Sequence, residues 1–220
     1  MYLHDNRNNR RDKKMDEIKI SKEELVDLIL ESEWNMFTSV LNVGGRASCQ
    51  DDPETFEIMR RSQFEAWNEL LLESYLADIL NASFENRNLL AEKYGYMMKY
   101  SFPQEYEAVK DELPEISEEK LRLVKAITEM HLDCRKEEIE KYPRLFGKGR
   151  PERITDEVPG FVSVESYTLG ELSTMSERSL KIYYDYMLEL KENGVNIAIL
   201  ILENTVKKYG YDSLEKAETK

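Results

Sequence analysis

Two charged side chains interrupt the apolar faces of neighbouring helical segments and are the clearest candidates for chemistry. Glu33 has apolar residues four positions before and after it, and so does Arg60. Residues four apart share one face of a helix, so both charges are expected on buried faces. A buried carboxylate without a partner is costly. We therefore predict an ion pair between Glu33 and Arg60, with Gln63 beside it.

The segment between these two charges, residues 42–52, contains a Gly-Gly pair and several polar side chains. We predict that it closes a polar pocket between the first two helices. Arginine in such a pocket suits a carboxylate or phosphate, so the expected occupant is a small anionic or zwitterionic metabolite. The residues predicted to bind it are Asn42, Arg46, Gln50, Arg60, Gln63 and, from a later loop, Arg150.

Two residues of this pocket are candidate catalytic groups. Cys49 lies just before the expected start of the second helix and near Arg46, and both features favour a thiolate. Glu33 is a candidate general base. Two features argue against a catalytic Cys49: its neighbours Asp51 and Asp52 are acidic, and no histidine is nearby in the sequence. No phosphate loop, serine elbow or cofactor motif is present, so whether the protein is an enzyme stays open and the cofactor stays unknown.

A second interpretation assigns these residues no ligand. Buried Glu–Arg pairs are also structural features of packed helices. The protein would then be a non-catalytic helical module that binds another protein. Its thirteen tyrosines and nine methionines suit an interface, although the same residues also fill cores. Both interpretations stay open.

Helical periodicity extends over most of the chain, and Ser21 with Glu24 forms a capping box before the first apolar stripe. We predict a single all-α globular domain of about eight helices, built from antiparallel helix hairpins and without a sheet. The main helical segments are expected near residues 21–40, 53–67, 69–81, 87–100, 117–142, 163–175, 176–192 and 195–209.

Two segments lack this periodicity. Residues 1–16 are basic, and we predict a disordered tail before a domain at 17–220, although a basic arm can also bind an acidic partner. Residues 143–162 contain glycines and prolines that favour a long loop. Its basic residues can cover the pocket as a lid or pair with the protein's own acids; they are Arg144, Lys148, Arg150 and Arg153.

Composition excludes several function classes. A net charge of −13 argues against nucleic-acid binding. Two cysteines suit neither a disulfide framework nor a zinc site, and His131 with Cys134 makes too few ligands, so we predict no metal. The longest apolar run, residues 197–202, is shorter than the ~20 residues of a membrane span. No secretory signal is recognisable, and we expect a cytoplasmic protein.

Several stretches carry a family resemblance. They are 33–37 (EWNMF), 42–50 (NVGGRASCQ), 55–64 (TFEIMRRSQF), 88–94 (NLLAEKY), 149–151 (GRP), 170–172 (GEL) and 203–206 (ENTV). Through them the chain resembles the bacterial family catalogued as domain of unknown function 4125. The resemblance covers nearly the whole chain after the basic tail and implies a single bacterial domain. It carries over no activity, cofactor or catalytic residue.

Overall fold

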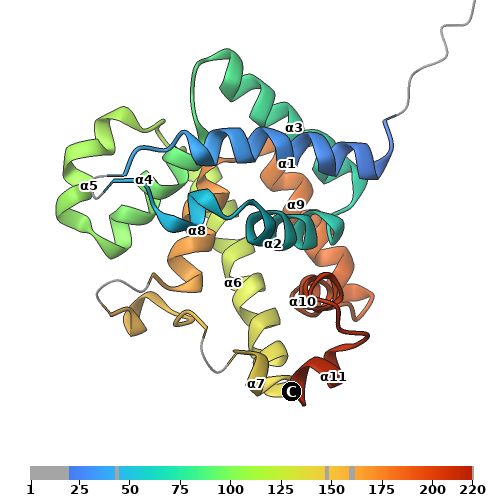
Figure 1. Cartoon of the computed structure of the whole chain (residues 1–220). Helices are drawn as coiled ribbons and strands as arrows, with labels where there is room; N and C mark the ends of the chain where they lie inside the picture. The colour runs from blue at the N-terminus through green and yellow to red at the C-terminus, as the bar shows by residue number, and fades with distance from the viewer. Residues whose placement is uncertain (1–19, 43–44, 147–148, 159–161, 220) are drawn as a thin grey trace, which may run out of the picture.

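The fold was obtained as a computed structural model that describes residues 20–42, 45–146, 149–158 and 162–219. Within these ranges the chain forms eleven α-helices and three short 3-10 turns, with no β-sheet (Figure 1). The prediction of a single all-α domain is confirmed. None of the described helices is both long enough and apolar enough to span a membrane.

The total of eleven exceeds the prediction of about eight helices, because three of them are short; the other eight have eleven residues or more. They are α1 (Lys22–Thr38), α2 (Pro53–Glu65), α3 (Glu69–Phe84), α4 (Leu89–Ser101), α6 (Glu118–Lys141), α8 (Val164–Thr174), α9 (Glu177–Glu192) and α10 (Ile197–Lys208). The three additional helices are short: α5 (Pro103–Val109), α7 (Pro143–Phe146) and α11 (Leu214–Glu218). The 3-10 turns are η1 (Ser48–Asp51), η2 (Lys110–Glu112) and η3 (Ile154–Asp156).

Every one of the eight longer helices begins at a side-chain cap. In each case an Asp, Asn or Ser oxygen accepts a hydrogen bond from a backbone N–H of the first turn, which satisfies a donor that the helix itself cannot satisfy. The capping residues are Ser21, Asp52, Asn68, Asn88, Ser117, Ser163, Ser176 and Asn196. The helix starts are therefore set locally by the sequence.

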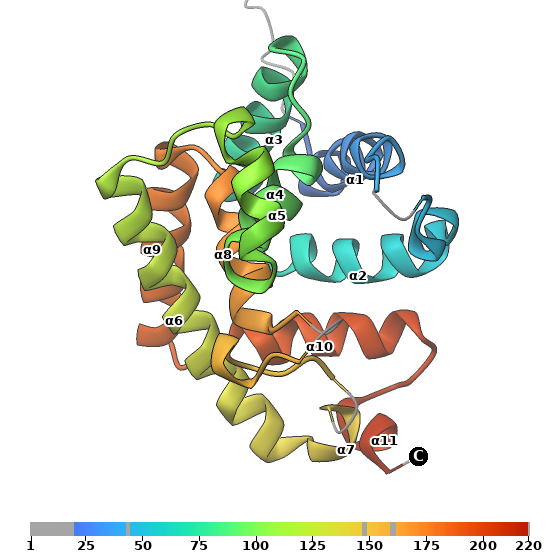
Figure 2. The same ribbon diagram turned by 90° about the vertical axis from the view of Figure 1, so that its left-hand side faces the viewer.

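The first two helices cross steeply and do not form the antiparallel hairpin predicted for them. Figure 1 shows α1 lengthwise and α2 end-on, and Figure 2 shows the reverse. The connecting segment is long and is folded back on α1 by Gln50, whose amide donates to the carbonyl oxygens of Phe37 (2.8 Å) and Val40 (3.0 Å). This segment redirects the chain before α2 begins.

The predicted hairpin of α3 with α4 is also replaced by other contacts. Helix α3 packs mainly on α1 and α9, whereas α4 packs mainly on α8 and also on α1. The start of α4 is attached to α1, because Asn88 donates from Nδ2 to the carbonyl oxygen of Met36 (2.8 Å) and to Ser39 Oγ (3.0 Å). A short connection thus does not make these two helices close neighbours.

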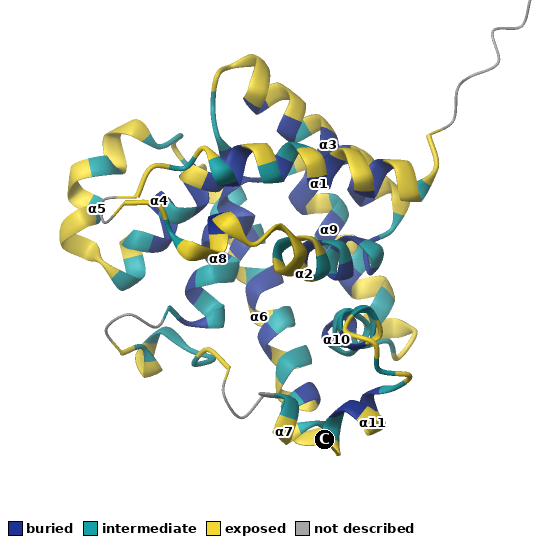
Figure 3. Ribbon diagram, viewed as in Figure 1, coloured by how far each residue is buried: buried dark blue, intermediate teal, exposed yellow. Residues whose placement is uncertain are grey.

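Helix α8 lies near the middle of the molecule (Figure 3) and packs mainly on α4 and α6. Residues 169–174 are all buried, so this helix contacts protein on every side. Aromatic side chains fill the space next to it: Trp67 packs edge-on against Phe64 and Tyr75, with ring centroids 5.1 and 5.6 Å apart, and lies 5.1 Å from Tyr183. This layer surrounds the buried charges described below.

The loop predicted at 143–162 contains the short elements α7 and η3, and its described part is tied to α6. Arg153 donates to both carboxylate oxygens of Glu129 (2.6 and 2.9 Å), and Glu152 accepts two hydrogen bonds from Arg135 (2.8 and 3.0 Å). Arg153 thus pairs with an acidic residue of the protein itself. This is the second of the two roles considered for the basic residues of the loop. Lys148 and the predicted tail at 1–16 lie outside the described residues.

Candidate functional site

The predicted pair of Glu33 and Arg60 forms at the crossing of α1 and α2. Arg60 donates from Nε to Glu33 Oε2 (2.7 Å) and from Nη2 to Glu33 Oε1 (2.6 Å), which is the two-pronged geometry that suits guanidinium and carboxylate. Tyr75 of α3 adds a third hydrogen bond to Glu33 Oε1 (2.6 Å). Glu33 has no exposed surface, so all of its partners are internal.

The pair is one end of a larger buried charge network. Arg60 Nη1 donates to Glu171 Oε1 (2.9 Å) of α8, and Lys93 Nζ of α4 donates to Glu171 Oε2 (2.8 Å). Gln63 completes it, accepting from Arg60 Nη1 (2.8 Å) and donating to Glu171 Oε1 (3.0 Å). We call these five residues the charge network: Glu33, Arg60, Gln63, Lys93 and Glu171.

The charges of this network balance. Two carboxylates face two cations, and each charge has an opposite partner within 3.0 Å. Burial alone would raise the pKa of Glu171, but Arg60 and Lys93 hold it well below its ordinary value. Burial alone would likewise lower the pKa of Lys93, and the carboxylate of Glu171 raises it instead. Glu171 and Lys93 are therefore both charged at neutral pH, and the formal charges of the network sum to zero.

Close packing of α4 on α8 brings Lys93 to Glu171. Gly170, next to Glu171, allows this approach: a Cβ atom there would lie 2.4 Å from Met97 Cγ and 2.8 Å from the carbonyl oxygen of Lys93. The second contact is with backbone, which cannot move aside as a side chain can. Glycine at this position is thus required by the distance between the helices.

The predicted loop residues form a cluster of their own. Gln50 accepts hydrogen bonds from Asn42 Nδ2 (2.8 Å) and from the backbone N–H of Ala47 (2.9 Å). Arg46 donates to Asp51 Oδ1 (2.7 Å) and to the carbonyl oxygens of Thr38 and Gln50 (3.0 and 2.8 Å). These contacts stabilise the turn between α1 and α2, and none of them joins the charge network.

Cys49 and Arg150 lie near the network without hydrogen-bonding to it. The guanidinium of Arg150 lies 5.3 Å from the ring centroid of Tyr167, and Lys93 Nζ lies 3.5 Å from the same centroid. Burial raises the pKa of Tyr94, and Lys93, Tyr167, Cys49 and Arg60 are all close enough to affect it. Cys49 is exposed and belongs to the turn η1 before α2.

His131 and Cys134, the pair weighed as metal ligands, face different neighbours. The Nε2 atom of His131 lies 2.7 Å from the hydroxyl oxygen of Tyr183, and burial lowers the pKa of this histidine to about 4. Among the described residues no group of three or more His, Cys, Asp or Glu side chains is placed to hold a metal ion.

Three cavities on the surface of the described part of the chain contain no lining residue from the charge network. One lies between α6 and α9, a second lies beside α5, and the third is a groove on the outside of α1 and α2. Metabolite binding at the predicted residues stays a prediction.

Lys93 and Glu171 were not among the predicted site residues. The criterion that identified Glu33, a charged residue with apolar residues four positions away, also applies to them. Lys93 has Leu89 and Met97 four positions before and after it, so it too interrupts an apolar face. Glu171 lies four residues after Tyr167 in the same way. The pairing of the two residues, which are 78 positions apart, depends on the fold.

A family model described as a protein of unknown function (DUF4125) matches residues 23–219. The chain belongs to this family. The predicted membership is thus confirmed over the whole described domain. Comparison of this DUF4125 protein with curated proteins and with solved structures finds no match. Its function must be argued from its own residues.

Proposed function

We propose that the protein is a non-catalytic helical module that binds a basic segment of a partner protein in the groove outside α1 and α2. In this proposal the charge network stabilises the packing of the helices. Its charged groups already have internal partners, so they have little capacity left for a ligand. The proposal rests on the residues that line the groove.

The groove is about 340 Å³ in volume and has an apolar floor. Its α1 wall consists of residues 27, 30, 31 and 34, whose spacing places them on one helix face. The half-buried rings of Trp34 and Phe56 lie 5.0 Å apart between the two helices. Partly exposed aromatic rings beside polar residues are typical of protein-binding surfaces.

The rim of the groove is acidic. Asp27, Glu31 and Glu57 face one cation, Arg61, which gives the rim a net charge of −2. Arg61 is already held by Asp27 (2.7 Å) and Glu57 (3.2 Å). Within the described residues Glu31 forms no ion pair, and it is exposed. A segment rich in lysine and arginine with one apolar anchor fits this surface in both charge and hydrophobicity.

The proposal is tested with a labelled peptide in which lysine and arginine alternate around a single leucine. Fluorescence anisotropy should show binding that weakens as salt is added, because exposed charges are screened. Glu31→Lys should weaken binding by roughly five- to thirtyfold, because the reversal removes a contact worth ~1 kcal/mol and adds a repulsion of up to similar size. Glu105→Lys on α5 changes the net charge equally and should leave binding unchanged. Equal effects of the two variants would refute the groove as the binding site.

One observation favours the alternative, a small anionic or zwitterionic metabolite at the outer end of the network. There Lys93 and Arg150 both lie against the ring of Tyr167, so two cations converge beside one aromatic ring. Inorganic phosphate, acetate and glycine should then raise the melting temperature of the wild type but not of Arg150→Ala. If none of the three compounds changes the melting temperature of the wild type, all three are excluded as ligands of this site.

A further inference from the structure

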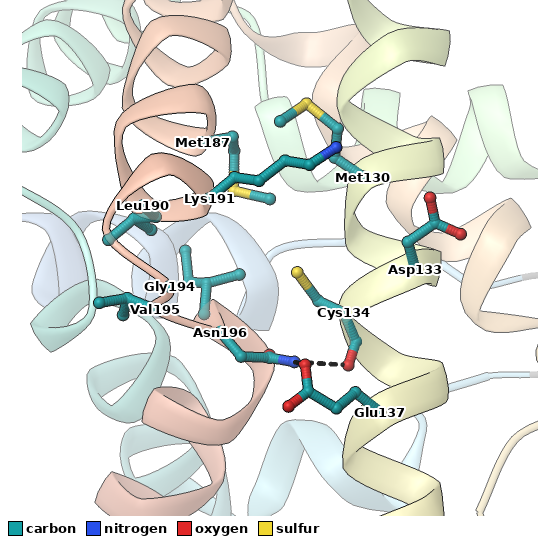
Figure 4. A pocket seen from close by; sticks show the side chains of 11 residues that line it. Met130, Asp133, Cys134, Glu137, Met187, Leu190, Lys191, Gly194, Val195 and Asn196 are labelled. Carbon is teal, nitrogen blue, oxygen red and sulfur yellow. Dashed lines mark hydrogen bonds between the residues drawn. The ribbon is translucent and has the colours of Figure 1, made fainter.

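A cavity of about 260 Å³ lies between α6, α9 and the turn that joins α9 to α10 (Figure 4). Gly194 forms this turn with φ of +66°, a conformation that glycine adopts without strain. None of the lining residues belongs to the charge network or to the α1–α2 groove. The cavity is thus a separate candidate site.

The floor of the cavity is apolar and comes from all three elements. Met130 belongs to α6, Met187 and Leu190 belong to α9, and Val195 and Ile197 come from the turn and the start of α10. Methionine side chains are unbranched and adapt to the shape of a ligand. An occupant of this cavity would therefore need an apolar body.

One cation at the opening, Lys191, is not held in an ion pair with any described residue. Asp133 is paired with Lys136 (2.7 Å), and Glu137 is paired with Lys141 (2.5 Å), in both cases within α6. In the described part of the chain Lys191 has no ion pair, and Figure 4 shows its side chain reaching across the cavity toward α6. The pKa of Asp133 is lowered mainly by Lys136 and least by Lys191.

The thiol of Cys134 is part of the wall. Figure 4 shows its sulfur pointing from α6 toward α9. Burial raises the pKa of this thiol, and the backbone N–H of Ile197, which hydrogen-bonds to it, offsets this only in part. A protonated thiol is a weak nucleophile, so Cys134 reacts slowly with alkylating reagents and serves here as a soft apolar part of the wall.

From these observations we infer that the cavity binds a small monocarboxylate with an apolar chain. The chain lies against Met130, Met187 and Leu190, and the carboxylate faces the ammonium group of Lys191. The volume is below the ~300 Å³ at which pockets for drug-sized ligands begin, which limits the occupant to a small molecule. A second carboxylate would face Asp133 and Glu137, so dicarboxylates are disfavoured. The inference does not depend on the proposed function.

The test uses the full chain with Cys49→Ser, which leaves Cys134 as its only thiol. The rate at which iodoacetamide modifies Cys134 is measured with hexanoate, 1-hexanol or hexylamine present. The three probes share the chain and differ in charge. Hexanoate should slow the reaction at the lowest concentration, and hexylamine should need the highest. Methyl NMR signals of Met130 and Met187 provide a second readout of binding.

Lys191→Gln removes the positive charge at the opening and leaves the apolar floor of the cavity unchanged. It should weaken hexanoate binding roughly threefold, as expected for one partly exposed charge pair, and leave hexanol binding unchanged. Lys181→Gln on the same helix removes an equal charge from an exposed position and should change neither. If hexanoate and hexylamine protect Cys134 equally, if neither protects it nor shifts the methionine signals, or if Lys191→Gln has no effect, the inference is wrong.

Discussion

Glu33 shows how a buried carboxylate is accommodated in this protein. It accepts two hydrogen bonds from Arg60 and one from Tyr75, at distances of 2.6 to 2.7 Å. Hydrogen bonds to a charged acceptor are roughly twice as strong as those between neutral groups. Loss of the Tyr75 hydroxyl leaves Oε1 of this buried carboxylate with one donor, Arg60 Nη2, in place of two.

Tyr75→Phe tests this directly. Removing the hydroxyl should lower the free energy of unfolding by about 1.5–3 kcal/mol, because the lost hydrogen bond goes to a charged group. Tyr186→Phe is the matched control: its hydroxyl donates to the neutral carbonyl oxygen of Ala66 (2.7 Å), so its loss should cost only about 0.5–1.5 kcal/mol. Urea denaturation of both variants gives the comparison. Equal costs would contradict the charged role of the Tyr75 contact.

At this scale the sequence predicts that a charge is buried but not which partner it meets. Glu33 and Arg60 were identified as a pair because their helices are consecutive in the chain. Glu171 is 111 positions from Arg60, and no local pattern relates the two residues. Arg46 donates to the carbonyl oxygens of Thr38 and Gln50, which the sequence did not predict, and ligand binding by Arg46 stays a prediction. Backbone acceptors of this kind are not visible in a sequence.

The contact between α4 and α8 brings Lys93 and Glu171 of the network together. Gly170→Ala should lower the free energy of unfolding by about 2 kcal/mol, because the added methyl group meets the backbone of α4. Gly95→Ala is the control: its Cβ would meet only the side chain of Leu113, which can rotate away. In thermal denaturation Gly170→Ala should have a clearly lower melting temperature than Gly95→Ala. The reverse order would show that α4 and α8 are not held this closely.

The end of α6 should make stability depend on pH. Burial raises the pKa of Glu138 from 4.5 to about 7, although Arg135 opposes this shift. The folded protein therefore binds this proton more tightly than the unfolded chain. The stability that protonated Glu138 contributes is fully present below pH 4.5 and is lost as pH rises through 7.

Glu138→Gln should remove this dependence. Relative to the variant, the wild type should lose about 1–3 kcal/mol of unfolding free energy between pH 5 and pH 8. Denaturation in urea at both pH values measures the difference. Glu140→Gln, at an exposed position of the same helix, should behave as the wild type does. A constant difference between Glu138→Gln and wild type at all pH values would contradict the shift.

Helix positions were predictable because their starts are encoded locally. Ser21, Asp52 and Ser117 each cap the helix that the sequence predicts after them. The arrangement of the helices was not predictable in the same way. Antiparallel hairpins were expected from short connections, but Asn88 attaches α4 to α1, and Gln50 folds the α1–α2 connection back. Both contacts join positions that are distant in sequence.

On the scale of the whole molecule, the charge network connects four helices, and Tyr75 joins a fifth to it. Glu33 belongs to α1, Arg60 and Gln63 to α2, Lys93 to α4 and Glu171 to α8, and Tyr75 attaches α3. Because the formal charges of the network sum to zero, the net charge of −13 is carried by the rest of the molecule. A surface of this charge favours basic partners and disfavours nucleic acid.

The central claim is that the charge network stabilises the fold and does not serve as a ligand site. Its most direct test is the free energy of unfolding of Arg60→Met, measured by urea denaturation beside wild type. We predict a loss of about 3–5 kcal/mol, because the substitution leaves Glu33 buried without its cation. An Arg60→Met protein as stable as the wild type, but no longer stabilised by an anion that stabilises the wild type, would contradict the claim.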